Sequence, residues 1–154
     1  MFIFSMRLWL SPHLAYLKKT LRMLGLDVRI RSKSRSGWLP NDRFIHPDRY
    51  PSWNTEAGAI TLKTETEAEQ VREILQALDL RPDPDRLLGR CLRCNLPLTP
   101  LQSEDLAPYR DQIPVYILQT QRHFNRCPGC GRIYWPGTHA RNMLARLQEL
   151  GLVE

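Results

Sequence analysis

Four cysteines in two matched pairs are the residues of this sequence best suited to a defined chemistry. The pairs are Cys91-Leu-Arg-Cys94 and Cys127-Pro-Gly-Cys130, and the 154-residue chain contains no other cysteine. A C-x-x-C turn directs two sulfur atoms toward one point, and two such turns supply the four thiolates of a tetrahedral zinc site. The spacing therefore predicts a structural zinc ion held by Cys91, Cys94, Cys127 and Cys130, with no open position for catalysis.

Two other uses of the cysteines are a pair of disulfides and a redox site. Disulfides form in oxidising compartments, but the apolar start from Met1 to Leu10 lacks the basic region and small-residue cleavage site of a signal peptide. A redox site would use one C-x-x-C pair rather than two. We therefore expect a cytoplasmic protein. No apolar run approaches the roughly 20 residues of a membrane span, so no membrane contact is expected.

The cysteines must be positioned by the C-terminal part, for which we expect a zinc ribbon module over residues 89–154. The 32 residues between the pairs exceed the roughly 15–20 of a compact ribbon, which leaves room for a small inserted lobe. Val115–Leu118 and Arg132–Trp135 have the composition of ribbon strands. A last helix is predicted by the apolar positions Met143, Leu144, Leu147 and Leu150.

The N-terminal part, residues 1–88, predicts an α/β lobe. A strand over 2–10 is followed by Ser11-Pro12, a helix start, and by a helix that Gly25 ends. Asp27–Arg31 alternates as a second strand, which completes a β-α-β unit. Residues 59–62 predict a third strand, and Thr64-Glu-Thr-Glu67 a capping box before a second helix. Residues 32–58 show no sustained period and predict a long irregular loop.

Positive charge is concentrated at the start of the chain. The net charge is +6, and residues 1–63 hold eleven Lys and Arg against four Asp and Glu. Such a region attracts nucleic acid, although a solvated basic face is the simpler explanation. The candidate contacts are Lys18, Lys19, Arg22, Arg29, Arg31, Lys33 and Arg35. The loop aromatics Trp38, Phe44, Tyr50 and Trp53 would either stack on bases or fold back onto the core.

Two stretches give the chain a family resemblance. The first is Leu17–Asp27, and the second combines Arg90–Leu98 with Phe124–His139 and Met143. Together they resemble the Mut-seven C-terminal RNase family, in which a PIN-like nuclease domain is joined to a zinc ribbon. The resemblance implies RNA cleavage by Mg²⁺ or Mn²⁺, held by carboxylates at the carboxyl ends of parallel strands.

The expected nuclease residues are missing from this sequence. The family places its first aspartate after strand one, where this chain has Ser11, and no counterpart of the second is found between residues 28 and 58. Asp42 and Asp48 are the weak replacements. The expectation is a catalytically degenerate, zinc-stabilised RNA-binding module. The alternatives are an active metal-dependent ribonuclease with relocated carboxylates and a module that binds a protein partner through its ribbon.

Overall fold

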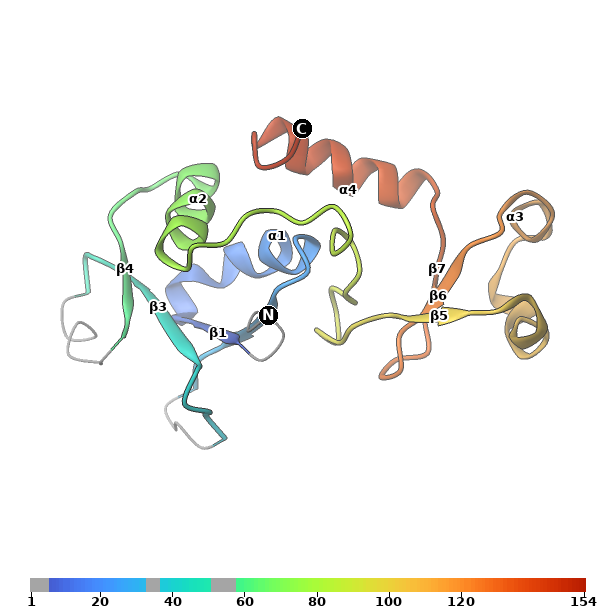
Figure 1. The fold of residues 1–154 in the computed structure, drawn as a ribbon, viewed down its shortest axis with the longest axis horizontal. Helices are drawn as coiled ribbons and strands as arrows, with labels where there is room; N and C mark the ends of the chain where they lie inside the picture. The colour runs from blue at the N-terminus through green and yellow to red at the C-terminus, as the bar shows by residue number, and fades with distance from the viewer. Residues whose placement is uncertain (1–5, 33–36, 51–57) are drawn as a thin grey trace.

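Four short strands in the N-terminal part form a parallel sheet in the order β2-β1-β3-β4 (Figure 1). The computed structural model describes residues 6–32, 37–50 and 58–154. The central strand β1 (Arg7–Leu10) pairs with β2 (Asp27–Ile30) on one side and with β3 (Arg43–Pro47) on the other. The outer strand β4 (Ile60–Leu62) pairs with β3. The predicted α/β fold is confirmed.

The β-α-β unit follows the predicted signals. Ser11 begins the 3-10 helix η2 (Pro12–Leu17), which continues as α1 (Lys18–Met23). Gly25 then adopts a φ of +86°, and a Cβ at this position would lie 2.5 Å from the Arg86 carbonyl oxygen. A side chain is therefore excluded both by the backbone conformation and by the close approach of the chain.

The prediction of only an irregular loop between residues 32 and 58 was wrong, because β3 lies inside this segment. Four of the five β3 residues are buried, so the strand lacks the alternation of a half-exposed strand. Pro47 ends the strand, which leaves a segment too short for a periodicity argument to detect. The consequence is that Asp42 and Asp48 flank a central strand.

The second helix, α2 (Glu67–Ala77), begins two residues later than the predicted capping box requires. Its N-cap is Thr66, whose hydroxyl oxygen accepts a hydrogen bond from the Glu69 backbone N–H. Thr64 instead donates its hydroxyl to Glu73, at 2.6 Å. The box motif was therefore correct in kind but displaced by two residues.

The C-terminal part contains a three-stranded antiparallel sheet in the order β5-β6-β7. Its strands are β5 (Thr99–Leu101), β6 (Phe124–Arg126) and β7 (Ile133–Tyr134). The 3-10 helices η4 (Ser103–Asp105) and η5 (Ala107–Gln112) lie between β5 and β6 in the chain. The predicted strand at Val115–Leu118 is wrong: these residues begin helix α3 (Val115–Thr120). Pro114 occupies the N-cap, and local helix geometry overrides the β propensity of the segment.

The last helix, α4 (Thr138–Glu149), returns from the antiparallel sheet to the N-terminal lobe (Figure 1). Met143, Leu147 and Leu152 are buried in the same apolar cluster as the leucines of β1 and α1. A second, smaller cluster beside the antiparallel sheet contains Ile113, Ile117, Phe124 and Ile133. Within the described part of the chain, no helix is long and apolar enough to cross a membrane.

Candidate functional site

The four cysteines form one cluster beside the antiparallel sheet. Their sulfur atoms all lie within 4.8 Å of one another. Cys91 and Cys127 are fully buried, whereas Cys130 is exposed. The Cys91 and Cys130 sulfur atoms are 3.9 Å apart, too far for a disulfide bond. The chain therefore has a four-cysteine metal site.

Tyr134 and the first cysteine turn favour the thiolate form of Cys91. The Tyr134 hydroxyl lies 3.2 Å from the Cys91 sulfur, and the Cys94 backbone N–H donates to the same sulfur at 3.4 Å. Burial opposes ionisation, but these bonds and a backbone N–H at Arg93 lower the pKa of Cys91 to about 6. Burial and the adjoining Cys91 raise the pKa of Tyr134, so its hydroxyl remains a donor. A thiolate is the form that binds metal.

The first cysteine turn is joined to the edge strand β2 of the N-terminal lobe by Asn95. This residue follows Cys94 with a φ of +60° and is 7% exposed. Its Oδ1 accepts from the Val28 backbone N–H at 3.0 Å, and its Nδ2 donates to Asp27 at 2.7 Å. The side chain thus occupies one main-chain hydrogen-bonding position, the Val28 N–H, that a further strand would use.

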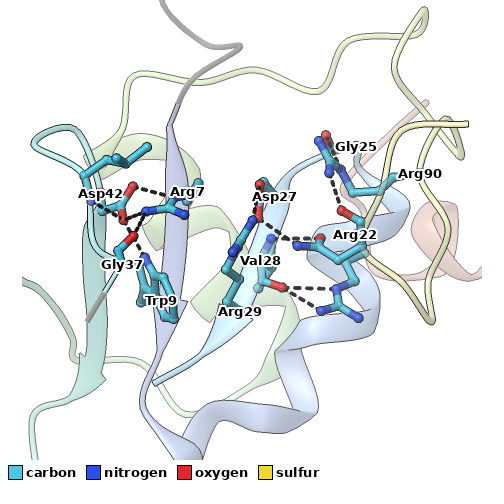
Figure 2. A network of polar contacts seen from close by, with 12 residues as sticks. Arg7, Trp9, Arg22, Gly25, Asp27, Val28, Arg29, Gly37, Asp42 and Arg90 are labelled. Atoms are coloured by element: carbon cyan, nitrogen blue, oxygen red, sulfur yellow. Dashed lines mark hydrogen bonds and ion pairs between the residues drawn. The ribbon is translucent and has the colours of Figure 1, made fainter. Parts of the chain in front are cut away.

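Arg22 and Arg90 complete this junction (Figure 2). The Arg22 guanidinium donates twice to the Val28 carbonyl, at 2.7 and 3.1 Å, and once to the Leu92 carbonyl, at 2.7 Å. Arg90 donates to the carbonyls of Gly25 and Asn95, at 3.4 and 2.5 Å. Burial lowers the pKa of Arg22 and that of Arg90. Arg22, expected among the nucleic-acid contacts, is therefore a buried residue of the junction.

A second candidate site lies at the carboxyl ends of the parallel strands. Ser11 follows β1, is fully buried, and accepts a hydrogen bond from the His13 backbone N–H at 3.4 Å. Asp48 follows β3 and is exposed, and its backbone N–H donates to the Leu62 carbonyl. The strand order changes direction between β1 and β3, which is where open α/β sheets bind ligands.

Comparison with known proteins gives one match. A family model for the Mut7-C RNAse domain covers residues 6–147. The chain belongs to this family. No curated protein and no solved structure matches it.

Membership of the Mut7-C family raises the question of which residues occupy the carboxyl end of the sheet, where the resemblance implies carboxylates. Ser11 stands where the resemblance expects the first aspartate, and serine supplies neither the charge nor the two oxygens of a carboxylate. The structure also places an acidic residue at this edge, because Asp48 directly follows the central strand β3. Across residues 6–32, 37–50 and 58–154, the cysteines are nevertheless the one cluster of three or more potential metal ligands.

Asp42 lies at the opposite, amino end of β3, and both of its carboxylate oxygens accept hydrogen bonds (Figure 2). Its carboxylate accepts from Arg7 at 2.6 and 3.0 Å, from the Trp9 indole at 2.8 Å, and from the Leu39 backbone N–H at 2.9 Å. Burial raises the pKa of Asp42, but these donors outweigh it and hold the pKa below 3.8. The structure separates Asp42 from Asp48 by the length of the strand, so the two do not form one site.

The predicted basic contacts are divided between two faces of the sheet. Lys18 and Lys19 belong to α1, in the helical layer. Arg29 and Arg31 lie against the aromatic residues of the other face, with Arg29 over Trp9 and Arg31 over Phe44 at 4.4 Å from the ring centroid. Arg29 also pairs with Asp27. Lys33, Arg35 and Trp53 lie outside the described residues.

The loop aromatics fold back onto the sheet where the structure describes them. Trp38 stacks on Trp9 with ring centroids 5.0 Å apart, and Phe44 is 2% exposed. Tyr50 instead stacks on His13 at the carboxyl end, with centroids 4.0 Å apart. The roles of Asn95 and Tyr134 were not predicted. The position of a polar residue directly after the first cysteine pair was the available signal for Asn95, whereas nothing in the sequence distinguished Tyr134.

Proposed function

We propose that this chain is a zinc-stabilised, RNA-binding member of the Mut7-C family that does not cleave RNA at a divalent-cation site. The observation that carries the proposal is the chemistry of the carboxyl edge of the parallel sheet. A nuclease of this kind gathers carboxylates there to hold the cation. In this chain Ser11 follows the central strand β1, and the described residues bring no group of three potential metal ligands together at this edge.

Zinc is the metal that best fits the cysteine cluster. Four thiolates around zinc at about 2.3 Å would lie about 3.8 Å apart at the corners of a tetrahedron, and the Cys91 and Cys130 sulfur atoms are separated by 3.9 Å. A bound zinc ion would stabilise the folded form and leave no position for a reacting water. The chain's own contribution is to ionise and orient the thiolates through Tyr134 and the backbone of the first cysteine turn.

Exposed cations at the carboxyl edge can contact phosphate groups. Within two residues of their carboxyl ends, β2 is followed by Arg31, β3 by Asp48 and Arg49, and β4 by Lys63. The two residues after β1 are uncharged, as Ser11 and Pro12. Arg49 and Lys63 are both exposed. The Arg31 guanidinium lies over Phe44, and the Glu73 carboxylate is occupied by the backbone N–H groups of Lys63 and Thr64. Arg49 and Lys63 are therefore the cations that can contact the RNA backbone.

Binding of a labelled single-stranded RNA, measured by fluorescence anisotropy over a range of salt concentrations, tests this proposal. We expect affinity to fall steeply with salt, because phosphate contacts release counterions. Replacing both Arg49 and Lys63 with Met should weaken binding and reduce the logarithmic salt slope by about 0.7 for each lost contact. Arg141→Met is the matched control, because it removes one positive charge from an exposed position on α4. RNA binding that is absent, or equally weakened by the control, would contradict the proposal.

One observation favours a second function, residual metal-dependent cleavage. Asp48 is exposed directly after the central strand β3, at the edge where Mut7-C nucleases are expected to bind their cation. A single carboxylate can still hold Mg²⁺ when RNA phosphates and water complete the coordination. Cleavage of RNA that requires Mn²⁺ or Mg²⁺ and disappears in Asp48→Asn would support this second function over the first.

A further inference from the structure

The antiparallel sheet carries a pocket that neither the cysteine cluster nor the carboxyl edge uses. Its volume of about 340 Å³ falls within the range of ligand pockets, about 300–1,000 Å³. The pocket lies where β5 and β6 meet the helices η4 and η5. Its walls combine a cation, two carboxylates, an aromatic ring and apolar groups, which include Leu101, Glu104, Asp105, Pro108, Tyr109 and Arg126.

Arg126 is the polar anchor of this pocket. It lies opposite Thr99 in the β5–β6 register, two residues from the buried Phe124 and so on the same face of the sheet. Its guanidinium carbon is 5.3 Å from the centroid of the Tyr109 ring. Its Nε is buried and has no hydrogen-bond partner among the described residues. A buried donor of this kind is costly unless an acceptor is supplied.

Glu104 and Asp105 bring negative charge to the same pocket. Both residues are exposed on the short helix η4. In the described part of the chain, neither forms an ion pair with Arg126, although all three line one cavity. Opposite charges held apart in this way are complementary to a ligand that offers an acceptor to the guanidinium and donors to a carboxylate.

We propose that this pocket binds a single unpaired guanine base of RNA. Guanine O6 and N7 would accept from Arg126, and N1–H and the N2 amino group would donate to Glu104 or Asp105. Tyr109, with Arg126 against its ring, supplies the stacking surface that unpaired bases use. Adenine would place its N6 amino donor where guanine has O6, facing the Arg126 donors, and so fits poorly. The inference rests on the proposed RNA binding and names the base that is recognised.

Mononucleotides test the pocket without any contribution from the carboxyl edge. The probe is GMP, with AMP as its comparison, added to the zinc-loaded protein while NMR resonances of the Arg126 Nε–H and the Tyr109 ring are followed. We expect GMP to shift both resonances and AMP to leave them in place. The double variant Glu104→Gln with Asp105→Asn should weaken the GMP response about tenfold, whereas Asp111→Asn, an exposed control in η5, should not. Equal shifts with GMP and AMP, or no shifts with either, would overturn the assignment.

Short RNAs separate this inference from the proposed function. Two single-stranded pentamers that differ only in a central G or A should bind with about a tenfold preference for G. Equal binding of both pentamers contradicts the guanine assignment and leaves RNA binding intact. If neither pentamer binds, the proposed function fails, and the GMP shifts alone decide whether the pocket recognises guanine.

Discussion

Asp42 and Asp48 flank one strand, but their surroundings give them different roles. Asp42 binds Arg7 and Trp9 at the amino end of β3, and its side chain is fully buried. Asp48 is exposed at the carboxyl end of the same strand, and its backbone N–H donates to the Leu62 carbonyl of β4. At the scale of single residues, the sequence contains two equivalent acids, and only the three-dimensional contacts distinguish them.

Asp42→Asn should therefore destabilise the protein, by about 2–3 kcal/mol at pH 7, because it leaves a half-buried arginine without its charged partner. The pKa of Asp42 is lowered in the folded state, so its stabilisation is present above the ordinary value of 3.8 and is lost as pH falls through the lower, folded-state pKa. Urea denaturation of wild type and Asp42→Asn at pH 7 and near pH 3 measures both effects.

Asp48→Asn is the matched control for this experiment. Its exposed carboxylate should contribute no more than about 0.5 kcal/mol to stability at either pH. A larger loss of stability in Asp48→Asn than in Asp42→Asn would contradict the assignment of Asp42 as structural.

The cysteine residues were the best predicted part of the molecule. Their chemistry is local, because two C-x-x-C turns specify a four-sulfur cluster at any separation along the chain.

Arg22 shows the opposite case. Its position in a basic segment suggested a surface contact, but it is 8% exposed and bonds the chain of β2 to the first cysteine turn. Nothing in the spacing of basic residues distinguishes a buried arginine from an exposed one.

At the scale of elements, the least predictable ones were those whose partners are distant. β3 is central, short and almost entirely buried, so its identity depends on β1 and β4 rather than on its own pattern. α3 contains residues typical of strands but follows a proline that begins a helix. By contrast, the β-α-β unit was predicted correctly, because its cap, its leucines and Gly25 are all local signals.

The junction between β2 and the first cysteine turn makes a prediction at this scale. Asn95→Ala removes the acceptor for the Val28 N–H, so hydrogen exchange at the Val28 amide should become at least tenfold faster. Removing the metal with a chelator should accelerate the same amide in wild type, because the metal holds the turn that carries Asn95.

Asn142→Ala, a substitution on the exposed face of α4, should leave Val28 exchange unchanged. If chelation accelerated exchange only in the antiparallel sheet and left Val28 protected, the cysteine site and the lobe would be uncoupled, and the role given to Asn95 would be wrong.

At the scale of the whole molecule, α4 ties the two sheets together. It follows β7 directly and buries Leu147 in the apolar cluster of the N-terminal lobe. Arg146 on the same helix pairs with Glu67 of α2, with nitrogen and oxygen 3.0 Å apart. The amphipathic pattern of α4 was visible in the sequence, but the surface that it covers was not.

Leu147→Ala should lower the free energy of unfolding by about 2–5 kcal/mol, the range for leucine truncation in a packed core. Helix α4 follows β7 and packs against the N-terminal lobe, so the two sheets should unfold together. NMR signals of both Val28 and Ile133 should therefore disappear in one transition during urea denaturation. Gln148→Ala, on the exposed face of the same helix, is expected to change stability by less than about 0.5 kcal/mol. Separate transitions for the two sheets would contradict this coupling.

The central claim is that this Mut7-C domain binds RNA at a carboxyl edge that no longer supports metal-dependent cleavage. The most direct measurement incubates end-labelled single- and double-stranded RNA with excess zinc-loaded protein and Mn²⁺ or Mg²⁺, at concentrations where anisotropy shows the RNA bound. We predict that bound RNA remains intact. Cleavage products that require the added cation and vanish in Asp48→Asn would contradict the claim and identify an active nuclease built on a single carboxylate.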